Sequence, residues 1–100
     1  MAKPPSGPIR VHSLEGNLNI FSIQQQWMEV QVLLEVEKGT ACLDLASVGD
    51  LDQSGLQLIC ALEKVFKSKE VEFRVVGAKG TWKADFASLG LGHLLEGGTP

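Results

Sequence analysis

The segment from residue 40 to residue 76 constrains the fold most, because it reads as strand, helix and strand in close succession. Residues 40–45 are short, apolar and β-branched at their start, which predicts a buried strand. Residues 54–67 repeat apolar side chains at helical spacing, and residues 71–76 alternate as a strand does. Such a unit favours a right-handed crossover and a largely parallel or mixed sheet. The chain is therefore predicted to be an α/β protein with helices packed on at least one face of its sheet.

Two short strands are predicted ahead of this unit. Residues 9–14 and 17–20 have the composition of strands, and they flank Glu15-Gly16. Glycine suits the tight turn of a hairpin. We therefore expect a hairpin over residues 9–20.

A first helix is predicted from Ser22 to about Val36. Ser22 and Gln25 match a capping box, in which the two side chains satisfy backbone donors at a helix start. An apolar stripe at helical spacing should face the core, while Gln24, Gln31 and Glu35 point elsewhere. Its members are Ile23, Trp27, Val30 and Leu34. Alternation at residues 30–32 is a competing strand signal, but the long stripe and Gly39 as a stop favour the helix.

The second predicted helix buries one face, and a third, short helix follows the last strand. The buried residues of the second helix are expected to be Leu58, Ile59, Leu62, Val65 and Phe66. Thr81 could cap the third helix, which carries Trp82, Phe86 and Leu89 before Gly90. The whole is one domain over residues 9–96, with a flexible tail at residues 1–8 and another at 97–100. About four to five strands and about three helices are expected.

Composition and charge exclude several classes of function. One hundred residues suit one core, and the net charge of −3 without a basic block argues against a nucleic-acid partner. No apolar run approaches the length needed to cross a bilayer, so we expect a soluble cytoplasmic protein without membrane insertion. Cys42 and Cys60 lie in apolar segments without metal-type spacing and are expected to be reduced structural thiols.

The run from Ala41 to Ile59 resembles the signature of STAS domains. It has an apolar strand ending in Asp44-Leu45, then a turn, then Asp52-Gln53-Ser54-Gly55 at the start of an apolar helix. The wider order of elements agrees over roughly residues 9–95. In the STAS proteins that act as anti-sigma factor antagonists, a partner kinase that is also the anti-sigma factor phosphorylates the serine of this motif. The resemblance therefore implies a protein-interaction switch with Ser54 as phosphoacceptor.

Two alternatives stay open beside this switch. Gln57-Leu58 is also similar to STAS proteins of chemotaxis and lipid-transport gene clusters, which implies a scaffold or subunit of a larger complex, of ABC type in lipid transport, without phosphorylation. Some STAS domains are thought to sense a nucleotide or another small ligand. Each reading implies a binding protein, and a homodimer is compatible with all of them.

A helix start is chemically suited to carry a regulated serine. Its free N–H groups and positive end attract anions, so a phosphate on Ser54 would be tolerated beside Asp50 and Asp52. The simpler alternative is that Ser54 only caps the helix while the two aspartates form a turn. Leu56 and Cys60 are expected at the edge of the core stripe, among polar residues, where they could contact a partner. The motif and partner-binding residues are thus Asp44, Asp50, Asp52, Gly55, Leu56, Gln57 and Cys60.

Other candidate chemistry is weak. The run Gly77-Ala78-Lys79-Gly80-Thr81 lacks the spacing of a phosphate-binding loop. His12 and His93 have no Cys or carboxylate at ligand spacing, which gives no indication of a metal site. Nothing resembles a nucleophile elbow, and the chain has little room for a substrate pocket. We therefore predict a binding protein without cofactor or metal, and not an enzyme.

Overall fold

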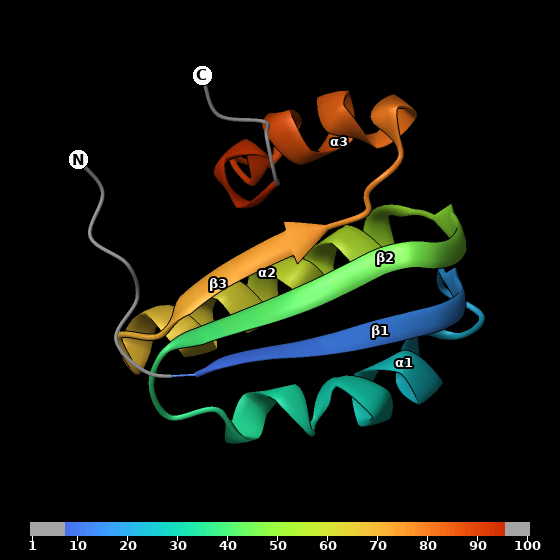
Figure 1. The fold of residues 1–100 in the computed structure, drawn as a ribbon. Helices are drawn as coiled ribbons and strands as arrows, with labels where there is room; N and C mark the ends of the chain where they lie inside the picture. The colour runs from blue at the N-terminus through green and yellow to red at the C-terminus, as the bar shows by residue number, and fades with distance from the viewer. Residues whose placement is uncertain (1–7, 96–100) are drawn as a thin grey trace.

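The computed structural model describes residues 8–95, in which helices and strands alternate (Figure 1). Apart from Pro8, the predicted tails at residues 1–8 and 97–100 lie outside this range. The main elements are β1 (Ile9–Leu18), α1 (Ile23–Val30), β2 (Thr40–Leu51), α2 (Gln53–Ser68), β3 (Glu72–Val76) and α3 (Lys83–Ser88). Short 3-10 helices are η1 (Leu33–Glu35), η2 (Gly80–Trp82) and η3 (Gly92–Leu94).

The described residues form one parallel sheet in the order β1-β2-β3. The prediction that residues 40–45 form the central strand is confirmed, although β2 continues to Leu51. Figure 1 shows α2 behind β2 and β3, while α1 lies along β1 and also touches α2. The core between these layers includes Leu43, Ile59, Leu62 and Phe66. The predicted α/β class is confirmed, and all three of these strands are parallel.

The predicted hairpin over residues 9–20 is wrong, because β1 is one continuous strand. Gly16 has the positive φ of 86° that a turn would use, but Glu15 and Gly16 still pair with β2. The register shifts on either side of them, so this site is a bulge and the chain keeps its direction. Gln26 of α1 donates from its side-chain amide to the carbonyls of Glu15 and Asn17, at 2.8 Å each. The sheet therefore has three strands over residues 8–95, fewer than the four to five expected.

The first helix is shorter than predicted, and one residue of its predicted core stripe is exposed. It ends at Val30, where i→i−3 hydrogen bonds tighten the chain into a turn and then η1. Of the predicted stripe, Val30 is buried and Ile23 and Leu34 pack against the core, but Trp27 is 37% exposed and Gln26 is buried instead. Ser22 precedes the helix without the predicted side-chain cap, because its hydroxyl donates to Asn17 O at 2.6 Å.

The second helix and the last strand agree with the prediction to within one residue. Of the expected core residues in α2, only Val65 is partly exposed; Leu58, Ile59, Leu62 and Phe66 are buried. Of the residues predicted for the third helix, Trp82 and Phe86 are buried as expected, but Leu89 is 37% exposed; Trp82 lies in η2 and Leu89 follows α3. Thr81 lies inside η2 and does not cap α3.

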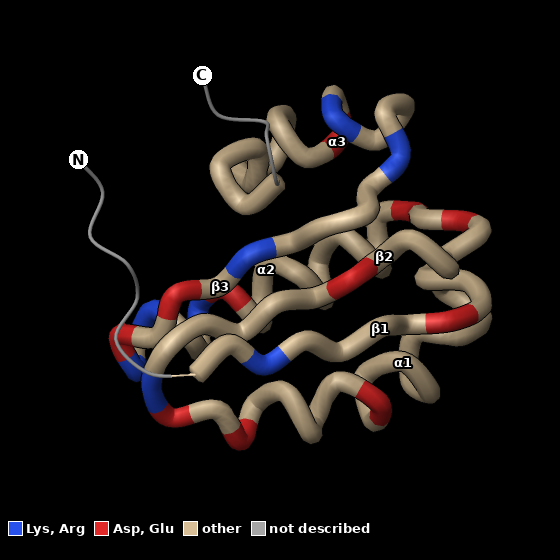
Figure 2. The backbone as a smooth tube through the Cα atoms, in the orientation of Figure 1, with Lys and Arg blue, Asp and Glu red and all other residues tan. Residues whose placement is uncertain are grey.

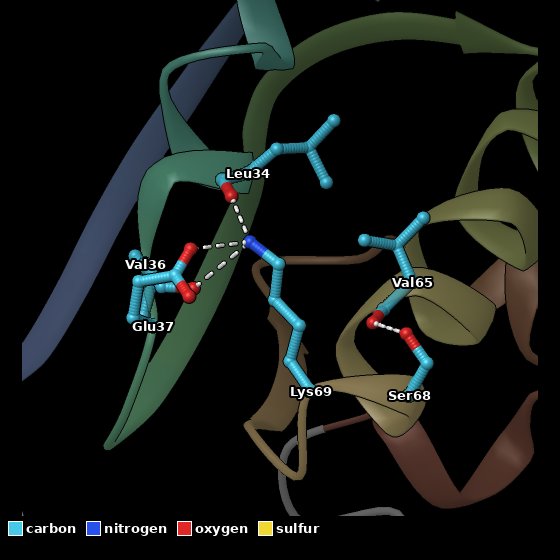
Figure 3. Close-up of polar contacts among 6 residues, drawn as sticks. All are labelled: Leu34, Val36, Glu37, Val65, Ser68 and Lys69. Atoms are coloured by element: carbon cyan, nitrogen blue, oxygen red, sulfur yellow. Dashed lines mark hydrogen bonds and ion pairs between the residues drawn. The ribbon is translucent and has the colours of Figure 1, made fainter.

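Lys69, the residue that follows α2, binds the segment between α1 and β2. Its Nζ donates to Leu34 O at 2.5 Å and Val36 O at 3.5 Å, and pairs with the Glu37 carboxylate at 2.9 Å (Figure 3). The two carbonyls belong to the end of η1, where intrahelical donors run out. One ammonium thus satisfies several acceptors and holds η1 against α2.

Gly55 lets the first turn of α2 approach the ends of β1 and β2. A Cβ at this position would lie 2.4 Å from Leu18 O and 2.7 Å from Leu51 Cδ1. Real Cβ contacts are never this short, so a side chain would push the helix away from the sheet. The motif needs glycine here for packing and not for an unusual φ.

We expect Lys69→Met to lower the free energy of unfolding by about 1–2 kcal/mol, since it keeps the aliphatic stem and removes the charged donor. Denaturant unfolding measures the loss. Lys67→Met, an exposed change on the same helix, is the control and should stay within about 0.5 kcal/mol of wild type. Equal losses in the two variants would show that the Lys69 contacts are not stabilising.

Gly55→Ala should destabilise the protein by about 1–3 kcal/mol net, although alanine is the better helix former. The clash includes a backbone carbonyl, which cannot rotate away as a side chain can. Gly80→Ala is the matched control, because a Cβ there meets nothing within 4 Å. Thermal or denaturant unfolding of both variants tests this, and a Gly55→Ala protein as stable as wild type would contradict the close approach.

Candidate functional site

Ser54 is the second residue of α2 and borders an open groove between α1 and α2. The groove has a volume of about 390 Å³, and its lining carries no charge. Besides Ser54, the lining residues are Ile20, Ile23, Trp27, Gln57, Leu58 and Ala61. The half-buried serine therefore joins an apolar surface that two helices build together.

Asp52, and not Ser54, caps α2. Its Oδ1 accepts from Ser54 N at 2.9 Å and from Gly55 N at 3.3 Å. The alternative in which Ser54 itself caps the helix is therefore wrong. Within residues 8–95 no hydrogen bond joins the Ser54 hydroxyl to another group. This hydroxyl is not needed for the fold and is available for chemistry.

The loop before α1 is held to the same end of α2. Asp52 Oδ2 accepts from Ile20 N at 3.0 Å, and Asp50 accepts from Asn19 Nδ2 at 3.2 Å. Asn19 Oδ1 in turn accepts from the backbone N–H of Phe21 at 3.0 Å and of Ser22 at 3.2 Å. Figure 2 shows the acidic positions where β2 passes into α2. Two carboxylates thus organise the loop of residues 19–22.

This loop and α1 present apolar side chains around the groove. Phe21 is 95% exposed, Met28 70% and Ile20 64%. A second hollow, of about 390 Å³, lies next to the groove and is lined by Ile23, Gln24, Trp27 and Met28. Clustered exposed apolar residues of this kind are typical of protein interaction sites. Sequence reasoning missed Ile20, Phe21 and Met28, although the excess of apolar residues beyond one stripe was a signal for them.

The structure gathers some of the predicted site residues and separates others. Asp52, Gly55 and Gln57 lie with Ser54 at the start of α2, and Gln57 is exposed in the groove, whereas the Asp50 side chain contacts Asn19. Leu56 is only 7% exposed and turns toward α3, so the prediction that it offers exposed apolar surface is wrong. A helix that follows later in the chain covers it. Cys60 is partly buried against the core.

Asp44 has a structural environment apart from this surface. Its carboxylate accepts from Ser13 Oγ at 3.1 Å and Ala46 N at 2.9 Å, and Gly77 packs closely against it. These partners belong to β1, to β2 and to the loop after β3. Asp44 therefore holds the strands together at this point of the sheet.

Of the weaker candidates, Lys79 and His93 have structural partners, whereas His12 Nε2 is buried without a hydrogen-bond partner among the described residues. Lys79 donates to Gly49 O at 2.9 Å and lies 5.2 Å from the Trp82 ring centre. His93 pairs with Glu63 of α2. No group of three or more metal-ligating side chains occurs among the residues that the structure describes. The helices of this part of the chain are also too short or too polar to cross a membrane.

Comparisons with solved structures show a shared fold. The anti-sigma factor antagonist SpoIIAA in its unphosphorylated form has a TM-score of 0.67 and 18% identity, over 86% of this chain and 76% of that chain. A sulfate transporter family protein from Wolinella succinogenes has a TM-score of 0.70 and 12% identity, over 94% and 80%. The SulP transporter STAS domain from Vibrio cholerae has a TM-score of 0.64 and 18% identity, over 89% of this chain and 69% of that chain.

Two sequence comparisons give different results. A search of curated proteins gives no match. The family model described as Mlab, STAS domain, matches residues 9–96, which is nearly the whole chain. The chain therefore belongs to the STAS-domain family described by this model.

Proposed function

We propose that this protein is a STAS-domain regulator that binds another protein through the groove beside Ser54 and is controlled by phosphorylation of that serine. One observation carries the proposal: the Ser54 hydroxyl has no hydrogen bond in the described structure and borders an uncharged groove ringed by exposed apolar residues. A partner that covers this groove must bury the serine with it. Whether the Ser54 hydroxyl is phosphorylated then decides whether the partner can bind this surface.

Phosphorylation changes this surface by adding charge to a groove whose lining residues carry none. A partner kinase would transfer the terminal phosphoryl group of a nucleoside triphosphate. The bond from Ser54 Oγ to phosphorus forms, the bond to the diphosphate leaving group breaks, and the hydroxyl proton passes to a base of the kinase. The product carries about −1.5 to −2 charges, next to Asp50 and Asp52. Burying that charge against apolar side chains is costly, so the partner is released.

The groove is suited to binding and offers little for catalysis. Its lining contains only two polar side chains, Ser54 and Gln57, and neither an acid nor a base. Proton transfer needs a positioned titratable group near the reacting atom. We therefore propose a binding module, in line with the anti-sigma factor antagonist that shares the fold.

A constitutive subunit of a transport complex is the second candidate. The matching family model is the Mlab one, and two of the similar structures come from sulfate or SulP transporters. In this alternative the same groove docks on a larger partner, and Ser54 stays unmodified. The two candidates differ only in the chemistry at Ser54, which makes that residue the one to test.

Ser54 variants separate the two candidates. The tagged chain is expressed in its host, a partner that copurifies is isolated, and its affinity for purified variants is measured by calorimetry. Ser54→Asp should weaken binding by about tenfold or more, because charge enters the groove. Ser54→Ala should keep both binding and stability within about 0.5 kcal/mol, because Asp52 supplies the cap.

Ser68→Asp is the matched control, since it adds the same charge at the far end of α2 and should leave binding unchanged. Mass spectrometry of the chain from host cells should also find phosphate on Ser54. If Ser54→Asp and Ser54→Ala bind equally well and no phosphate is found, the switch is wrong and the constitutive subunit takes its place.

A further inference from the structure

A single carboxylate joins the helix that carries Ser54 to the loop that carries Phe21. Asp52 Oδ1 binds the first turn of α2 through Ser54 N and Gly55 N. The other oxygen, Oδ2, binds Ile20 N at 3.0 Å, across an interval of 32 positions in the chain. Both oxygens are therefore engaged, each with a different element.

Ile20 and Phe21 are the apolar residues that this contact positions. Both are largely exposed, and Ile20 also lines the groove beside Ser54. Ordering an exposed loop before binding removes an entropic cost that a partner would otherwise have to offset. Phe21 follows the groove residue Ile20 directly, and an exposed aromatic side chain beside an apolar groove has the character of a binding anchor. The position of this anchor depends on the loop backbone.

We infer that Asp52 couples the state of Ser54 to the shape of the loop of residues 19–22. The inference rests on the proposed function and specifies how its regulation acts. With Ser54 unmodified, Asp52 holds Ile20 N and the loop presents its apolar side chains to the partner. A phosphate on Ser54 repels the neighbouring Asp52 carboxylate and competes for the N–H groups of the first turn. Asp52 then releases Ile20 N, and the anchor loses its fixed position.

Asp50 cannot replace Asp52 in this coupling. It reaches the loop through the side chain of Asn19 and makes no bond to the first turn of α2. Of these two aspartates, Asp52 is the one that contacts both the loop backbone and the turn that contains the serine. Asp52 is thus a positioning residue for the loop, and Asp50 provides a matched control.

Asp52→Asn separates the cap from the loop contact. Asparagine is a good N-cap, and its one oxygen can still accept from Ser54 N and Gly55 N. Its NH2 group cannot accept from Ile20 N. Hydrogen exchange followed by NMR should show the Ile20 amide exchanging about tenfold faster, with core amides of α2 unchanged. Asp50→Asn removes the same charge but keeps an acceptor for Asn19, so Ile20 should exchange as in wild type. Equal Ile20 exchange in the two variants would overturn the inference.

Phosphoserine incorporated at position 54 by genetic encoding tests the coupling itself. Ile20 exchange should again rise about tenfold, while phosphoserine at position 68, at the other end of α2, should leave it unchanged. In the Asp52→Asn background, phosphoserine at position 54 should add little, because the contact that it breaks is already lost. Two outcomes would show that Asp52 does not couple Ser54 to the loop. In one, Asp52→Asn and phosphoserine at position 54 each raise Ile20 exchange independently, so that their effects multiply; in the other, Ile20 exchange does not respond to phosphoserine at position 54.

These measurements need no partner, so they can fail separately from the proposed function. If Ser54→Asp weakens partner binding while phosphoserine at 54 leaves Ile20 unchanged, the coupling is wrong and the phosphate acts in the groove directly. If Ile20 responds but host cells place no phosphate on Ser54, the coupling is supported and the proposed regulation is wrong.

Discussion

The close approach of α2 to the sheet at Gly55 is the contact on which the surface around Ser54 depends. A Cβ there would overlap Leu18 O and the Leu51 side chain, so only glycine lets the helix begin directly against the ends of β1 and β2. Because the helix begins there, Asp52 can cap it and still reach the backbone that leaves β1. The glycine of the motif thus places the serine beside a loop that is distant in sequence.

Local patterns predicted those parts of the fold that local contacts determine. The strand and helix around the motif repeat apolar side chains at regular spacing; the helix was placed within one residue at each end, and the strand was placed at its start but continues six residues further than predicted. The hairpin prediction was wrong because a glycine with a positive φ, as Gly16 has, suits a turn and a bulge equally well. What separates the two is pairing with Ser47 and Val48, which lie far along the chain. No window of sequence around Gly16 contains that information.

The candidate site was predictable to the same extent. Ser54, Asp52 and Gly55 are neighbours in sequence, and the family resemblance identified them together. The alternative that made Ser54 the cap is wrong, and the sequence could not show this, because serine and aspartate are equally good caps and only the geometry chooses between them. Leu56 was misplaced because its surroundings depend on α3, which arrives from the end of the chain. Ile20 and Phe21 belong to another element and carry no motif.

The contact of Gln26 with β1 helps to explain why α1 contributes apolar surface to the groove. Glu15 and Asn17 lie on the edge strand β1, and their carbonyls accept from the side-chain amide of Gln26. A glutamine that serves two carbonyls must face the sheet, so Gln26 occupies a buried position that an apolar residue would otherwise fill. The next residues along the helix, Trp27 and Met28, then point away from the core. The buried amide and the exposed tryptophan are adjacent positions on one helix, and the tryptophan forms part of the apolar lining of the groove that Ser54 borders.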